Sequence, residues 1–400
     1  MARTFSEIQA LTDQHIMRTY GRLPLALVRG QGARVWDTEG RSYLDFVGGL
    51  AVNSLGHGHP KVVAAIREAA GYILHTSNLY HIGPQAELAA RLAALSGLDR
   101  VFFANSGTEA NEAAIKLARR WGRRQGQNRY KIITALNSFH GRTLGSLAAT
   151  GQPKYHEGFA PLPAGFVHVP FNDLEALRAA IDGETAAVML EPVQGEAGVY
   201  PADPGYLRGV RELCDRHGLL LILDEVQTGL GRTGRMFAYE HFGVKPDILT
   251  LAKALGGGIP IGAMLAREEI AAAFAPGAHA STFGGNPFAC RVALAVLDAL
   301  VGDDLAQAAA AAGQHLRGRL EELARRRGWI REVRGLGLML GVELDGVDAP
   351  RVMAAAQERG LLVNAIGQSI LRLLPPLIVT REELDEAVGI LEAALAAVAG

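Results

Sequence analysis

The sequence predicts an α/β protein with a large domain on a mostly parallel sheet, followed by a smaller α+β domain. From about residue 56 to 290, short apolar runs alternate with helical patterns; the runs cover 101–104, 131–135, 166–169, 187–190, 219–223 and 248–251. Strands that are apolar along their whole length and separated by helices are typical of a parallel sheet covered on both faces. The pattern therefore predicts such a sheet for the large domain.

The pattern changes beyond residue 290. An alanine-rich helical region reaches residue 327, strand-like segments such as 337–344 follow, and the chain closes on a helix. At the other end, a polar helix-like stretch precedes two strand-like runs around a Glu39–Gly40 turn, which predicts a hairpin. Because 400 residues exceed one ordinary core, we expect an N-terminal segment 1–55, a large domain 56–290 and a small domain 291–400.

Composition narrows the possible functions. With 40 Lys and Arg against 41 Asp and Glu, the chain has no electrostatic footprint for nucleic acid or an anionic membrane. Cys214 and Cys290 are too few for a disulfide framework and lack metal-ligand spacing, so no metal site is expected. Neither an apolar signal-peptide core nor a run long enough to span a bilayer is found. We expect a cytoplasmic protein.

Two apolar runs each end near one charged residue, Asp224 after the first and Lys253 after the second. Ligands of open α/β sheets bind beyond the carboxyl ends of the strands, so both side chains would enter one crevice. A desolvated lysine can lose its proton and attack a carbonyl, and an aspartate can hold a pyridine nitrogen protonated. Either residue alone would more simply be a solvent-facing charge; together they predict a pyridoxal phosphate site.

The segment 224–260 resembles the signature of the class III pyridoxal-phosphate aminotransferases. It carries Gln227, a Gly-Arg-Thr-Gly run at 231–234 and the Lys-Ala-Leu-Gly-Gly-Gly sequence that begins at Lys253. The resemblance implies the fold of type I pyridoxal-phosphate transferases, with a seven-stranded sheet in the large domain and an N-terminal segment packed against the small domain. It also implies catalytic roles for Lys253 and Asp224.

Ser106, Gly107 and Thr108 open a helix directly after the run at 101–104. A helix start presents backbone N–H groups, hydroxyls and a positive dipole end to an anion. Plain N-capping is the alternative interpretation, and capping is compatible with phosphate binding. The order of strand and helix favours a phosphate cup, and the resemblance agrees with it.

The resemblance assigns further residues to the cofactor. Phe139 is expected to stack on the pyridine ring, Val226 to pack on its opposite face, and Gln227 to hydrogen-bond the ring hydroxyl. Thr282, in a glycine-flanked turn, is expected to bind the cofactor phosphate of a partner subunit, which implies a homodimer with shared active sites. A simple turn is the alternative for Thr282. His140 is expected to shape the pocket without a catalytic role.

Arginines near this site are the candidates for binding substrate. Arg142 follows Phe139, and Arg372 lies in an otherwise apolar stretch where an unpaired guanidinium would be costly. Planar guanidinium groups suit carboxylate substrates. In the ω-aminotransferases of this class, the glutamate that matches Glu196 pairs with the arginine that matches Arg372, and the pair opens when 2-oxoglutarate binds.

Within the class, the chain is most similar to the acetylornithine aminotransferases of arginine biosynthesis, along essentially its whole length. This implies transfer of the distal amine of N2-acetyl-L-ornithine to 2-oxoglutarate, ping-pong through pyridoxamine phosphate, giving N-acetyl-L-glutamate 5-semialdehyde and L-glutamate. Leu50 suits a neutral acetamide tail, whereas Tyr20 matches a substrate-contacting tyrosine of the ornithine branch. Ornithine, succinyl-diaminopimelate or another ω-amino acid as donor, and a glutamate-semialdehyde type of aminomutase, remain alternatives. A transcription regulator would need a basic DNA-binding domain that residues 1–55 do not supply.

Overall fold

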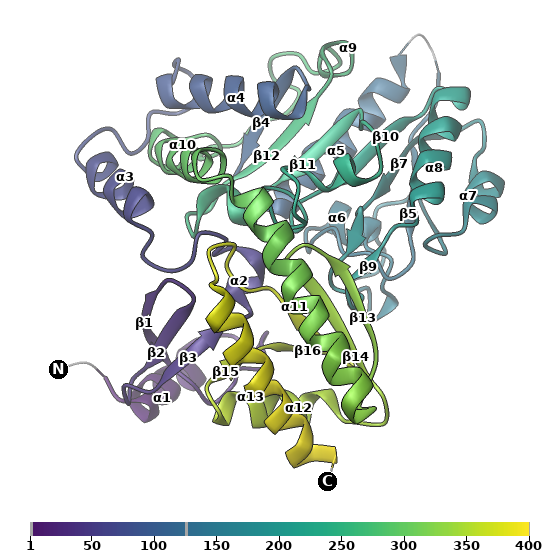
Figure 1. Ribbon diagram of the computed structural model, residues 1–400. Helices are drawn as coiled ribbons and strands as arrows, with labels where there is room; N and C mark the ends of the chain where they lie inside the picture. Colours follow the sequence, from purple (N-terminus) through teal and green to yellow (C-terminus); the bar gives the residue numbers. More distant parts are fainter. Residues whose placement is uncertain (1–2, 125–126, 400) are drawn as a thin grey trace.

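The computed structural model describes residues 3–124 and 127–399 of the chain. A large sheet with helices on both faces forms the upper part of Figure 1, and a smaller part with α11, α12 and α13 lies below it. Within the described residues, no helix is both long enough and apolar enough to cross a membrane.

The central sheet confirms the expected mostly parallel architecture. Its seven strands, in spatial order, are β4 (Arg100–Ala104), β12 (Gly262–Ala266), β11 (Ile248–Leu251), β10 (Leu220–Asp224), β7 (Thr185–Leu190), β5 (Lys131–Ala135) and β6 (Phe166–Val169). Strand β12 runs antiparallel to both of its neighbours, and the other six strands share one direction. Those six strands were predicted from the sequence, and β12 was not.

Alternate residues of the strands face opposite sides of the sheet, and an apolar cluster buries the strand side chains on each side. Ile222 of β10 belongs to an apolar cluster with helix α5 (Gly107–Gly122), whereas Leu223 belongs to the cluster on the opposite face. Successive side chains of a strand point to opposite faces, so burial on both sides requires the continuous apolar runs seen in the sequence. The other helices of this part are α3 (Pro60–Ala70), α4 (Gly83–Ser96), α6 (Leu144–Ala149), α7 (Leu174–Ala180), α8 (Pro204–His217), α9 (Glu268–Ala271) and α10 (Pro287–Gly302).

The smaller part combines both ends of the chain. An antiparallel sheet in the order β13 (Ile330–Leu336), β14 (Met339–Leu344), β17 (Ile370–Leu373) and β16 (Asn364–Ile366) accompanies helices α11 (Leu305–Arg327), α12 (Ala349–Glu358) and α13 (Arg381–Ala399). The N-terminal segment supplies α1 (Phe5–His15), β1 (Leu27–Gln31), β2 (Arg34–Asp37) and β3 (Ser42–Asp45). Strands β2 and β3 form the expected hairpin, and β15 (Leu361–Leu362) pairs parallel to β3.

The expected division after residue 290 falls inside helix α10, which continues to Gly302. Helix α11 begins at Leu305, and the intervening Asp304 has a left-handed backbone with φ 46°. A helix cannot continue through that conformation. We therefore propose that the division between the two parts lies at 303–304.

Candidate active site

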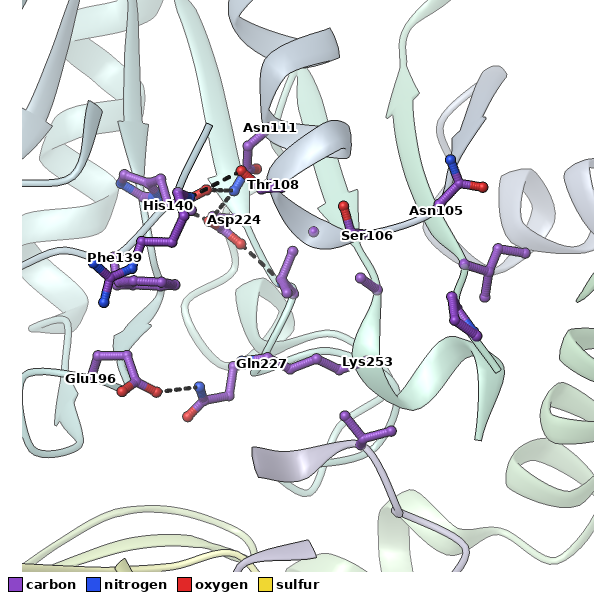
Figure 2. Close-up of a pocket in the computed structure, with 18 of the residues that line it drawn as sticks. Asn105, Ser106, Thr108, Asn111, Phe139, His140, Glu196, Asp224, Gln227 and Lys253 are labelled. Atoms are coloured by element: carbon purple, nitrogen blue, oxygen red, sulfur yellow. Dashed lines mark hydrogen bonds and ion pairs between the residues drawn. The ribbon is translucent and has the colours of Figure 1, made fainter. Parts of the chain in front are cut away.

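A cavity of about 450 Å³ lies beyond the carboxyl ends of β10 and β11. It brings together ten of the predicted site residues: Ser106, Gly107, Thr108, Phe139, Arg142, Glu196, Asp224, Val226, Gln227 and Lys253. Figure 2 shows this pocket with Asp224 beside His140 and Asn111, and with Glu196 facing Gln227. The volume is that of a pocket for a small cofactor with its substrate.

Lys253 lies two residues beyond the end of β11, as the first residue of the short helix η4 (Lys253–Gly256). Its backbone is left-handed, with φ 43°, which costs a residue other than glycine about 1 to 2 kcal/mol. Burial lowers the pKa of Lys253, and Arg372 adds to this effect, while Glu196 and Asp224 oppose it. The site therefore favours a neutral amine, the form that reacts with a carbonyl.

Asp224 is held by donors on both of its oxygens. Its Oδ2 accepts from Asn111 Nδ2 at 2.7 Å and from His140 Nδ1 at 2.8 Å, and its Oδ1 accepts from the Val226 amide at 3.0 Å. Thr250 Oγ1 donates to Asn111 Oδ1 at 2.7 Å, which fixes the orientation of that amide. Oδ1 retains capacity for a further donor such as a pyridinium.

Two buried titratable groups, His140 and Glu191, have pKa values shifted by this environment. Burial alone would lower the pKa of His140, but the hydrogen bond and charge of Asp224 outweigh it and the pKa is raised. Burial raises the pKa of Glu191 to about 7, although its carboxylate accepts from the amides of Phe139 at 3.0 Å and Gly195 at 3.3 Å. Glu191 thereby joins the loop of Phe139 to the loop of Glu196.

The start of α5 has the form expected of an anion site. Ser106 is the N-cap, and its hydroxyl accepts from the Glu109 amide at 3.3 Å, while the first amides of a helix have no partner within it. A Cβ on Gly107 would lie 2.6 Å from Val226 Cγ1, so only glycine allows Val226 to approach this closely. Thr108 also lines the pocket, and its hydroxyl accepts from the Arg142 amide at 3.2 Å. The residues here suit a phosphate next to an apolar wall.

At the far side of the pocket, Arg372 of β17 is 2% exposed and makes the predicted pair with Glu196. Its Nη1 donates to Glu196 Oε1 at 2.5 Å, to the Gly195 carbonyl at 3.2 Å and to Gln227 Oε1 at 3.4 Å. Nη2 donates to Asn364 Oδ1 at 3.4 Å, and Gln227 Nε2 donates to Glu196 Oε1 at 3.3 Å. Gln227 therefore contacts both members of the ion pair.

The two arginines of the site differ in their partners. Burial would raise the pKa of Glu196, but the charges of Arg372 and Lys253 outweigh it and hold the pKa below its ordinary value. Arg142 is exposed, and within the described residues its guanidinium makes neither a hydrogen bond nor an ion pair. Arg372 is thus neutralised by a carboxylate of the protein, whereas Arg142 is available to one from a substrate.

Arg372 contacts the lining residue Glu196 without lining the cavity itself, and three further predicted residues also lie outside it. Tyr20 is 73% exposed and lines a second cavity of about 710 Å³, next to Asn364. Leu50 is 44% exposed, in a short left-handed turn. Thr282 is exposed and lines a third cavity of about 340 Å³. A single chain does not bring these side chains to Lys253.

Three residues of the site, Asn111, Thr250 and Glu191, were not predicted from the sequence. For Asn111 a signal was present, because it shares the buried face of α5 with Ala114 and is 1% exposed. A polar residue at an apolar position of an amphipathic helix requires a buried partner. The partners, Thr250 and Asp224, are 139 and 113 residues away along the chain, and the sequence does not identify them.

Comparisons with known proteins decide the family. Residues 16–395 match the family model of class-III aminotransferases. The chain belongs to the class III aminotransferases. It is 55% identical over 380 residues to the acetylornithine aminotransferase of Caldanaerobacter subterraneus subsp. tengcongensis, covering 95% of this chain and 96% of that protein.

Solved structures agree with the family. The acetylornithine aminotransferase of Elizabethkingia anophelis superposes with a TM-score of 0.89 at 37% identity, covering 99% of this chain and 100% of that one. An ornithine aminotransferase of Toxoplasma gondii, with pyridoxal phosphate at partial occupancy in its active site, superposes with a TM-score of 0.96 at 37% identity, covering 99% and 95%. Class III aminotransferases use this cofactor, and Gly107, Asp224 and Lys253 would offer it space, a carboxylate and an amine.

Proposed function

We propose that this aminotransferase moves the distal amino group of N2-acetyl-L-ornithine to 2-oxoglutarate, giving N-acetyl-L-glutamate 5-semialdehyde and L-glutamate in arginine biosynthesis. One observation carries the proposal: Arg372 is buried and paired to Glu196 at 2.5 Å, in a pocket where Arg142 is free. One available cation suits an amine donor that presents one carboxylate. A second, masked cation suits a dicarboxylate acceptor that arrives later.

Pyridoxal phosphate, when bound, supplies an aldehyde and an electron-withdrawing ring that carries the amino group between the two substrates. Lys253 is placed to hold the cofactor and to move a proton at its Nζ, because its lowered pKa makes the neutral amine accessible. Asp224, held in place by its three donors, would keep a proton on the ring nitrogen. Ser106, Gly107 and Thr108 would hold the phosphate.

The remaining residues would determine how each of the two substrates binds. Arg142 would take the carboxylate of the amine donor and then the distal carboxylate of 2-oxoglutarate. While Glu196 covers Arg372, the donor has no cation near the reacting carbon to attract its carboxylate in the wrong orientation. Rotation of Glu196 away from Arg372 would then admit the second carboxylate of 2-oxoglutarate. Phe139 and Val226 would hold the ring from its two faces, and Gln227 its hydroxyl.

An ornithine-specific enzyme is the second candidate. It is supported by Tyr20, which lines the cavity next to Asn364, itself a neighbour of Arg372. Leu50 favours the acetylated donor instead, because an apolar side chain offers nothing to a free ammonium group. Turnover measured side by side on acetylornithine, ornithine, succinyl-diaminopimelate and 4-aminobutyrate tests the proposal. A higher kcat/KM for any donor other than acetylornithine would overturn it, and turnover without 2-oxoglutarate would indicate an aminomutase.

We further infer that the working unit is a cytoplasmic homodimer, in which Thr282 reaches the cofactor phosphate of the partner. The support is that Thr282 is exposed and lines a cavity other than the one that holds Lys253. Mixed dimers of Lys253→Ala and Thr282→Ala subunits should then contain one site without either lesion. A monomer that stays active at every dilution would contradict the shared site.

A further inference from the structure

Arg142 lies against two aromatic rings. Its guanidinium carbon is 3.8 Å from the ring centroid of Tyr155 and 5.5 Å from that of Phe139. The two rings meet edge to face, with centroids 5.9 Å apart and an interplanar angle of 84°. Both distances from the guanidinium are within the range of cation–π attraction. The rings therefore hold a cation that would otherwise be free to sample many rotamers.

Tyr155 is itself fixed to the loop that carries Phe139. It ends the short helix η2 (Pro153–Tyr155), and its amide donates to the Gln152 carbonyl at 3.0 Å. The Gln152 side chain donates to the Ser138 carbonyl at 3.0 Å, directly before Phe139. Next to Tyr155, the His156 ring contacts two carbonyls within 2.9 Å. The Tyr155 ring is thus half-buried on a well-anchored backbone.

Stacking uses the face of the guanidinium and leaves its edge free. The five N–H groups of arginine lie in the guanidinium plane, whereas contact with an aromatic ring is made perpendicular to it. Within the described residues, none of these groups on Arg142 finds an acceptor. Lys154 adds a second cation 4.8 Å from the Tyr155 ring centroid, which raises the local positive potential. The arrangement presents a carboxylate with a prepared, bidentate N–H edge.

We propose that Tyr155 is a positioning residue for Arg142 and thereby sets the preference of the enzyme for substrates with a carboxylate remote from the reacting carbon. Tyr155 does not line the catalytic cavity and acts through the guanidinium that does. The inference rests on the proposed function, in which Arg142 binds that carboxylate in both half-reactions. Loss of the ring would leave the guanidinium chemically intact and poorly oriented, so binding would weaken more than turnover.

The test compares Tyr155→Leu with its matched control Tyr155→Phe in the holoenzyme. The donors are acetylornithine and N-acetyl-1,4-diaminobutane, which is the same chain without the carboxylate, and the acceptor is 2-oxoglutarate. Tyr155→Leu should raise KM for acetylornithine and 2-oxoglutarate about 5- to 30-fold, the worth of a partly desolvated cation–π contact, with little change in kcat. Tyr155→Phe should restore KM to within about twofold, because a phenyl face also attracts cations.

The donor without a carboxylate separates positioning from a general structural role. Its kcat/KM should be the same in Tyr155→Leu and in the parent enzyme, and an equal loss on both donors would overturn the proposal. A Tyr155→Phe variant as poor as Tyr155→Leu would also overturn it, since the hydroxyl rather than the ring would then matter. Unchanged cofactor absorbance would show that the variants are folded and loaded.

A double-mutant cycle distinguishes a failure of this inference from a failure of the proposed function. In an Arg142→Ala background, Tyr155→Leu should add no further increase in KM, because the residue through which it acts is gone. An additive loss would assign Tyr155 a role independent of Arg142 and contradict the inference. If Arg142→Ala lowers kcat/KM equally for the two donors, the proposed role of Arg142 is wrong. If Arg142→Ala affects the two donors differently but Tyr155→Leu does not, only the positioning role of Tyr155 is wrong.

Discussion

Two polar clusters line the same pocket and differ in how completely they are bonded. Around Asp224, which is 4% exposed, the three hydrogen bonds to the carboxylate measure 2.7 to 3.0 Å, and the amide behind it is oriented by Thr250. Around Arg372, one bond of 2.5 Å to Glu196 is accompanied by contacts of 3.2 to 3.4 Å, and the Glu196 side chain is 26% exposed.

The difference corresponds to what each cluster must do. In the proposed function the ring nitrogen carries the same charge in both half-reactions, so its partner can be fixed by a buried hydrogen-bond network. In the proposed function, the cation that binds the second carboxylate must be hidden from one substrate and exposed to the other. The Glu196 carboxylate is partly exposed and held mainly by one ion pair, so it can rotate toward solvent, and the cost of uncovering the buried Arg372 would be offset by the incoming carboxylate.

The largest effect is expected on the fixed side. Asp224→Asn keeps the size of the side chain and removes its charge, so both half-reactions should slow by about 10²-fold or more in single-turnover absorbance measurements. Asp215→Asn is the matched control, because that aspartate forms an ion pair on α8 with 66% of its side chain exposed. A loss under about tenfold in Asp224→Asn would show that the electron-withdrawing ring does not depend on this carboxylate.

A smaller effect on the same side is expected from Asn111→Leu, a buried change of similar volume. It removes one bond to a charged group, worth about 1.5 to 3 kcal/mol, and should slow both half-reactions by about 10- to 100-fold. Thr250→Val leaves the donors of Asn111 in place and should cost less than about tenfold. Slowing of one half-reaction alone by Asn111→Leu would contradict a fixed network that serves both.

Glu191 connects the two clusters, and its titration should appear in the stability of the protein. With a pKa of about 7 in the folded chain against 4.5 ordinarily, it holds a proton between these values that the unfolded chain releases. The free energy of unfolding should therefore fall as pH rises through this window, by up to about 3 kcal/mol.

The measurement is denaturant unfolding of the parent and of Glu191→Gln between pH 5 and 8. The glutamine cannot titrate, so the advantage of the parent over the variant should shrink as pH rises. Glu175→Gln, at a residue whose side chain is 75% exposed, is the matched control and should show no such trend. A difference between parent and Glu191→Gln that stays constant from pH 5 to 8 would mean that the buried carboxyl is ionised throughout, and it would contradict the raised pKa.

The sequence predicted the parts of this molecule that depend on local pattern. Six strands, the N-terminal hairpin and the placement of Asp224 and Lys253 at strand ends follow from apolar runs that stop at a charge. Strand β12 was missed because Gly262-Ala-Met-Leu-Ala carries small residues and no β-branched side chain, and its antiparallel pairing is set by neighbours far away along the chain.

The same distinction between local pattern and long-range contact applies to the site. The Glu196–Arg372 contact was predicted, but through the resemblance, since no local rule joins residues 176 positions apart. The network of Asn111, His140 and Thr250 was not predicted, because their side chains meet only after three separate segments are assembled by the sheet. Tyr155 was not predicted for a similar reason, because its contact with Arg142 joins two separate segments of the chain.

The most direct test of a fixed and a movable side is Glu196→Ala, measured in each half-reaction separately by single-turnover absorbance changes. With its partner gone, Arg372 stays exposed to substrate, so it attracts the carboxylate of acetylornithine toward the reacting carbon and promotes the wrong orientation. We expect the acetylornithine half-reaction to slow by about tenfold or more, which corresponds to the free energy of one charged contact. The glutamate half-reaction should keep its rate or become faster. Equal slowing of both halves, or slowing of the glutamate half alone, would contradict the switch and leave Glu196 a structural partner of Arg372.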